Sequence, residues 1–183
     1  GEITFDAKDY KNALAYFSTL EDVSMDEEDL SLSVKGQFYC FYYLNNPIST
    51  IKYAKKTLQL SNINKKLKED SYLYLAKSYQ SVNQLDSAII YYDSIMYFTK
   101  SIAAAESKYH ICEIAYERKS YELCESLIME LVQQKPSYDY WLAKGILLLG
   151  DNFTAQNDYF NAKHSVESII ENYDGFNKKI HRN

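Results

Sequence analysis

A small or short side chain recurs along this chain at a nearly constant interval, and that period constrains the fold more than any other feature. Positions 13, 50, 88, 124 and 162 hold Ala, Thr, Ala, Cys and Ala, so the intervals are 37, 38, 36 and 38 residues. Apolar residues follow four positions later and again seven or eight positions later, which is the spacing of one face of an α-helix. This period predicts repeated helix pairs that stack on one another.

Each repeat unit is predicted to contain two helices. The first helices are expected at 28–45, 66–82, 102–118 and 138–156, and the second helices at 9–21, 47–60, 84–98, 120–134 and 158–173. Only two prolines and five glycines occur, and this scarcity favours long helices. The local signals are a capping box that begins at Ser24, a helix start at Asn46-Pro47, a break at Pro136 and a C′ residue at Gly175.

Positions where the two helices of a unit meet are expected to be buried. They hold Ala76, Tyr79, Ala88, Tyr92, Cys112, Cys124, Leu149, Ala162 and Val166. Cys112 and Cys124 are expected to be neighbours, with Cα atoms ~5–6 Å apart as in bridged pairs. The sequence leaves open whether they form a disulfide or remain two buried thiols.

This pattern resembles the tetratricopeptide repeat, most closely in Leu75-Ala76, Tyr79, Leu85, Ala88 and Tyr92. The resemblance implies an all-α, right-handed superhelix of about four and a half helix pairs. It covers 1–175, with units at about 1–23, 24–62, 63–99, 100–136 and 137–175, and leaves 176–183 as a tail. The glycine of the family's turn is replaced by Lys8, Asn45, Asn83, Lys119 and Asn157. Asparagine tolerates the left-handed conformation that such a turn uses.

The resemblance also implies a function, which is to bind another protein or peptide on the concave face. The corresponding positions are Lys35, Tyr39, Tyr43, Leu73, Lys77, Gln80, Tyr109, Glu113, Tyr116, Leu147 and Asp151. Tyrosines suit an interface, although packing between neighbouring helices is the alternative role for each of them. Residues 106–173 are similar to the C-terminal repeats of bacterial cell-envelope proteins, which favours a periplasmic or cell-envelope location over the cytoplasm.

Two other functions are also compatible with the sequence. A structural spacer without its own ligand is the first alternative, and an enzyme or a lipid- or glycan-binding domain on a helical scaffold is the second. The net charge of −5 argues against nucleic acid, and no apolar run is long enough to span a membrane. His110, His164 and His181 lack metal-ligand spacing, and no catalytic residue, metal or cofactor is predicted.

A local cluster of lysines is assigned mainly to solubility, with contact to an acidic surface or lipid headgroup as the alternative. It comprises Lys52, Lys55, Lys56, Lys65, Lys66 and Lys68.

Both ends of the chain are expected to be cut from a longer array. Apolar side chains there should lack cover, namely Ile3 and Phe5 at the start and Val166, Ile169, Ile170 and Tyr173 at the end. The tail could cover one patch through Phe176 and Ile180. Because exposed apolar ends invite partners, we expect copies to stack end to end.

Overall fold

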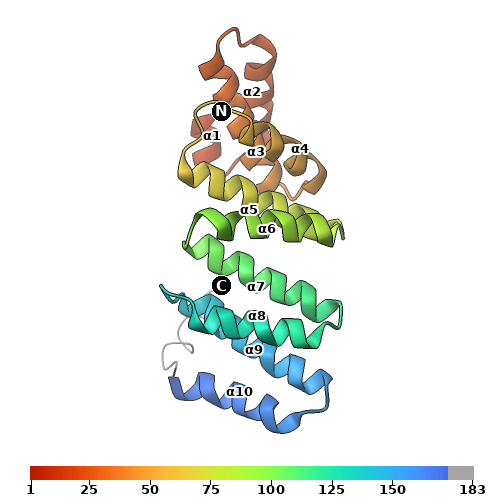
Figure 1. Ribbon diagram of the computed structural model, residues 1–183. Helices are drawn as coiled ribbons and strands as arrows, with labels where there is room; N and C mark the ends of the chain where they lie inside the picture. Colours follow the sequence, from red (N-terminus) through yellow and green to blue (C-terminus); the bar gives the residue numbers. More distant parts are fainter. Residues whose placement is uncertain (173–183) are drawn as a thin grey trace. The chain divides into compact units, whose positions relative to one another are not determined.

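The computed structural model describes residues 1–172, and side chains through residue 169. Within that range the chain forms ten α-helices and no strand (Figure 1). Their bounds are α1 Glu2–Asp6, α2 Tyr10–Val23, α3 Glu27–Tyr43, α4 Pro47–Leu58, α5 Lys65–Ser81, α6 Leu85–Phe98, α7 Ile102–Glu117, α8 Tyr121–Gln133, α9 Asp139–Ala155 and α10 Tyr159–Asn172. Each predicted helix is present, and its ends lie within two residues of the prediction.

The helices form two compact units, residues 1–97 and the residues from 98 onward. In the first unit α2 packs on α3, α3 on α4 and α4 on α5. In the second unit α7 packs on α8 and α9, and α9 packs on α10. Consecutive helices therefore lie side by side within each unit (Figure 1), as helix pairs that share a core require.

Every pair turns through the same backbone conformation. Lys8, Asn45, Asn83, Lys119 and Asn157 have φ angles of 61°, 54°, 58°, 57° and 63°, which confirms the left-handed turn expected from the sequence. The next residue in each case donates its backbone N–H to the carbonyl five residues earlier, at 2.9 Å. That bond is the 6→1 contact by which a helix end commonly satisfies its free carbonyls.

The helix starts agree with the sequence at α4 and differ at α3. The Asn46 side chain caps α4 by accepting a hydrogen bond from the Ser49 N–H, and Pro47 follows it. The α3 cap is Asp26, which accepts from the Asp29 N–H at 2.8 Å, so the prediction of Ser24 was wrong. Ser24 instead ends α2 in an extended conformation. Both Ser24 and Asp26 have side chains that can cap a helix, and Asp26 is the one that begins α3.

The break before α9 is confirmed. Pro136 lies between the end of α8 at Gln133 and the start of α9 at Asp139, and the Lys135–Pro136 bond is cis. Gly175, the predicted C′ residue of the last helix, lies outside the described residues.

The predicted core is confirmed except at Val166, which is 41% exposed. Helix α10 presents Ala162, Ser165 and Ile169 as its buried face, and Val166 falls on the flank of that face. Ile169, which was expected to lack cover, is therefore buried, whereas Ile3 is 86% exposed as expected. Ile170, Tyr173, Phe176 and Ile180 have no described side chain.

Cys112 and Cys124 share one hydrophobic cluster of the second unit, with both side chains fully buried. Each is a free thiol, as is the buried Cys40. Burial raises the pKa of Cys112 to about 12, and the nearby Cys124 contributes to the increase.

A carboxylate ties three helices of the first unit together. Glu21 on α2 accepts hydrogen bonds from Gln37 on α3 at 2.6 Å, and from Tyr53 at 2.8 Å and Lys56 at 2.6 Å on α4. Burial alone would raise the pKa of Glu21, but these three donors stabilise its charged form and lower the pKa overall.

The lysine cluster is partly used inside the chain, which the sequence did not indicate. Besides the Lys56 contact, Lys66 pairs with Asp70 at 2.6 Å, and Lys65 lies 4.0 Å from Glu69. Both acidic partners are buried, so these lysines neutralise core-facing charge in addition to solvating the surface.

Candidate partner-binding surfaces

The predicted contact residues lie on the first helices of the pairs, so each unit carries its own part of the candidate surface. In the first unit they are on α3 and α5, and in the second unit on α7 and α9.

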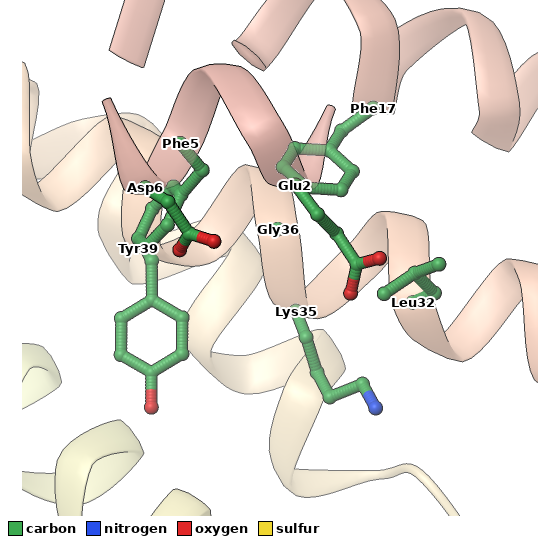
Figure 2. A pocket seen from close by; sticks show the side chains of 8 residues that line it. All are labelled: Glu2, Phe5, Asp6, Phe17, Leu32, Lys35, Gly36 and Tyr39. Carbon is green, nitrogen blue, oxygen red and sulfur yellow. The ribbon is translucent and has the colours of Figure 1, made fainter. Parts of the chain in front are cut away.

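A pocket of about 430 Å³ opens between α1 and α3 in the first unit. Apolar groups of Phe5, Phe17, Leu32 and Gly36 form part of its lining. Figure 2 shows the acidic side chains of α1 extending toward the side of the pocket where α3 presents its lysine. The charged lining residues are Glu2, Asp6 and Lys35. A pocket with an apolar lining and both signs of charge suits an apolar group better than a small ion.

Tyr39, which also lines this pocket, is held in place by its hydroxyl group. That group donates to the Asp70 carboxylate at 2.8 Å, and Asp70 also binds Lys66. Burial and the neighbouring Asp70 charge raise the pKa of Tyr39. The hydroxyl therefore remains a donor at neutral pH.

Tyr43 projects further from the same helix and is 46% exposed. Its ring stacks on Tyr10 with centroids 4.7 Å apart and planes at 15°. The preceding residue, Tyr42, stacks on Tyr74 of α5, with ring centroids 3.6 Å apart. Rings fixed by their neighbours lose little freedom on binding, which favours a contact surface.

In the second unit a lysine is surrounded by aromatic rings. The Lys144 ammonium group on α9 lies 4.4 Å from the ring centre of Tyr109, 5.3 Å from that of Trp141 and 5.9 Å from that of Tyr140. Cation–π attraction to three rings holds the positive charge at a fixed place on this face.

Helix α7 places a histidine and two glutamates beside Lys144. His110 Nδ1 is 2.6 Å from Glu113 Oε2, and its Nε2 is 3.8 Å from Glu106 Oε1. Burial would raise the pKa of Glu113, but hydrogen bonds from His110 and Tyr109 lower it overall. This arrangement keeps a negative charge next to the Lys144 positive charge, so the face can orient a dipolar or charged partner.

The described residues contain no group of three or more His, Cys, Asp or Glu side chains that could hold a metal ion. Among the described helices, none is sufficiently long and apolar to cross a bilayer.

The sequence matches no family model and no curated protein. Solved structures do resemble the chain. The C-terminal part of a TPR repeat-containing protein from Cytophaga hutchinsonii aligns at a TM-score of 0.76 and 17% identity, over 96% of this chain and 64% of that chain. The fold is that of a tetratricopeptide-repeat solenoid. BtubC (BKLC) from P. vanneervenii aligns at a TM-score of 0.68 and 14% identity, over 96% of this chain and 78% of that chain.

Within the tetratricopeptide-repeat fold, the side chains of the predicted contact residues differ in their exposure to solvent. Leu73 and Tyr109 are each only 6% exposed, so most of each side chain lies in the packed interior. Partly buried residues are Lys35, Tyr39, Lys77, Gln80, Glu113 and Tyr116. Tyr43, Leu147 and Asp151 are exposed. The roles of these accessible residues in binding stay predictions.

Sequence reasoning missed the Lys144 arrangement and the His110–Glu113 contact. Tyr140 and Lys144 are four residues apart on α9, and His110 and Glu113 are three apart on α7, so each spacing was readable as one helix face. The approach of Tyr109 to Lys144 joins two helices, and no local pattern encodes it.

Proposed function

We propose that this chain is a scaffold whose tetratricopeptide repeats bind a polypeptide along the first helices of the pairs. The supporting observation is that aromatic and charged side chains on these helices are fixed by neighbours yet remain accessible. Tyr43, stacked on Tyr10, is the example in the first unit, and Tyr140, beside Lys144, is the example in the second. Side chains ordered in advance lose less entropy when a partner binds.

Each unit offers a matched test of this proposal. Tyr43 on α3 and Tyr16 on α2 are tyrosines of the first unit with 46% and 58% exposure. In the second unit, Leu147 on α9 and Leu123 on α8 are leucines with 40% and 54% exposure. Only Tyr43 and Leu147 lie on first helices, so each pair differs in the face and not in the residue type.

The experiment selects binders from a displayed random-peptide library and measures their affinities by calorimetry. For a peptide bound to the first unit, Tyr43→Ala should weaken binding about tenfold, a loss of ~1.4 kcal/mol, while Tyr16→Ala leaves it unchanged. Leu147→Ala and Leu123→Ala provide the same comparison in the second unit. Failure to enrich any peptide would support the spacer alternative, and equal losses for both members of a pair would place binding on another face.

We further propose that copies of the chain associate through their ends and that the protein is located in the bacterial cell envelope. The first idea rests on exposed apolar residues such as Ile3, and Ile3→Asp should abolish any concentration-dependent increase in sedimentation coefficient. The second rests on the resemblance of residues 106–173 to cell-envelope repeat proteins. Recovery of the native protein only in the cytosolic fraction would overturn it.

A further inference from the structure

The pocket between α1 and α3 carries two carboxylates that no cation of the described chain neutralises. Glu2 and Asp6 are exposed and stand four residues apart on α1, which places them on one face of that helix. Figure 2 shows both carboxylates extending from α1 toward α3. Within residues 1–169 neither of them forms an ion pair, and neither does Lys35, the remaining charged residue of the lining. The lining therefore has one excess negative charge.

The spacing of the two carboxylates favours a particular kind of cation. Like charges four residues apart on a helix repel each other, and a cation between them relieves that repulsion. A guanidinium group suits this place, because its planar set of N–H donors can bind both carboxylates at once. An ammonium group offers only a compact point charge and would bind less tightly.

Beside the carboxylates the pocket has apolar and aromatic surface. Phe5, Phe17 and Leu32 line it, and the Phe17 ring lies against Gly36, where the missing side chain leaves room for it. Tyr39 also lines the pocket, with its ring centre 6.1 Å from that of Phe5. An aliphatic stem can be buried against such surface while the charge at its end stays near the carboxylates. The volume of about 430 Å³ falls within the range of roughly 300–1,000 Å³ that is common for ligand pockets.

We propose that this pocket receives an arginine side chain of a partner polypeptide. The guanidinium group lies between Glu2 and Asp6, and the aliphatic stem packs against Phe5 and Leu32. Charge complementarity selects this occupant, because an acidic side chain would meet two negative charges and an uncharged one would leave them unneutralised. The inference rests on the proposed function, since it names the side chain that the scaffold takes up in its first unit.

The test is an NMR titration of the ¹⁵N-labelled chain with the blocked peptide Ala-Leu-Arg-Leu-Ala at constant ionic strength. The matched probe contains citrulline, which keeps the shape of arginine but lacks its charge. The arginine peptide should cause saturable shifts of the amides of residues 2–6 and 32–39 and bind about tenfold more tightly than the citrulline peptide. Equal affinities, or linear shifts with both peptides, would overturn the inference. Guanidinium chloride at the same concentrations should not saturate these shifts, and saturation by it would identify a free cation as the occupant instead.

Variants connect the arginine preference to the two carboxylates. Glu2→Gln combined with Asp6→Asn should abolish the preference, because the amides keep the size of the side chains and remove their charge. Asp22→Asn combined with Glu28→Gln is the matched control, since both residues are exposed and neither lines the pocket. Lys35→Gln should tighten binding of the arginine peptide about threefold by removing a like charge. Equal effects of the two double variants would contradict the site, and unchanged circular dichroism of each variant establishes that the fold is intact.

This inference and the proposed function can fail separately. Library peptides that Tyr43→Ala weakens, but whose arginines can be replaced by citrulline without loss, would support the scaffold and refute the arginine pocket. If no library peptide is enriched while the arginine peptide still binds at the carboxylates, the pocket stands and the scaffold function fails. Shifts of the pocket amides with protein concentration alone, together with a rising sedimentation coefficient, would identify a second copy as the occupant and overturn the inference.

Discussion

The contact between Gly36 and Phe17 allows a stability prediction that follows directly from geometry. A Cβ atom at residue 36 would stand 2.5 Å from three carbon atoms of the Phe17 ring, a separation that real Cβ atoms essentially never show. The ring has little room to retreat, because Phe17 is 4% exposed and packs in a cluster with Ala13 and Cys40. Gly36→Ala therefore forces α2 and α3 apart or distorts the ring.

The magnitude follows from two opposing contributions. Overpacking in a filled core costs up to about 3 kcal/mol, while replacing glycine by alanine inside a helix gains about 1 kcal/mol. The net loss should be about 2 kcal/mol, which shifts a urea midpoint by about 1 M at an m-value of about 2 kcal/mol/M. Gly150→Ala is the control, because a Cβ there would meet its nearest atom, Val166 Cγ2, at 3.4 Å. It should gain up to about 1 kcal/mol.

Urea unfolding followed by circular dichroism reports on all helices, while fluorescence of Trp141, the single tryptophan, reports on the second unit. In the double variant Gly36→Ala/Phe17→Leu, the loss of stability should be smaller than the sum of the two single losses by at least about 1 kcal/mol. The smaller leucine side chain relieves the overlap with the new Cβ atom. The reasoning is refuted if Gly36→Ala raises the midpoint as Gly150→Ala does, or if the two substitutions simply add.

Other consequences can be measured in the same way. Glu21→Gln removes the charged acceptor of three hydrogen bonds and should cost about 2 kcal/mol at pH 7, whereas Asp22→Asn should change little. Because the folded pKa of Glu21 is lowered from 4.5, its stabilisation is present above that value and is lost as the pH falls through the folded pKa, so the variant and the native chain should converge in acid. With a pKa of about 12, the buried Cys112 thiol should react with a thiol reagent at pH 8 only as fast as its unit opens, and rapid labelling would contradict the burial. Lys119→Gly should raise stability by about 1 kcal/mol, since glycine adopts a positive φ without steric cost. Asn83→Gly should gain less, and equal gains would disprove the steric explanation.

The sequence predicted those features that repeat or act locally. Helix bounds and the left-handed turns follow from a period and from residues within a few positions of each other. The register of α10 was not predictable in this way, because Val166 and Ile169 are equally apolar and only packing against α9 decides which is buried. Contacts between side chains of different helices also could not be predicted from the sequence. Lys144 meets Tyr109 because α7 and α9 pack side by side, and a single sequence does not encode that distance.

The five left-handed turns are not equivalent, and this difference should decide which helix pairs unfold locally most easily. Lysine occupies the turn in the first and fourth pairs, where the conformation is costly, whereas asparagine occupies the other three. Stability in a repeat array is approximately a sum over units and their neighbours, so a costly turn weakens its own pair most. Amide hydrogens of α1–α2 and α7–α8 should therefore exchange with solvent sooner than those of the asparagine pairs. Because none of these turn residues is among the predicted contact positions, rigidity can change during evolution without altering the surface that a partner meets.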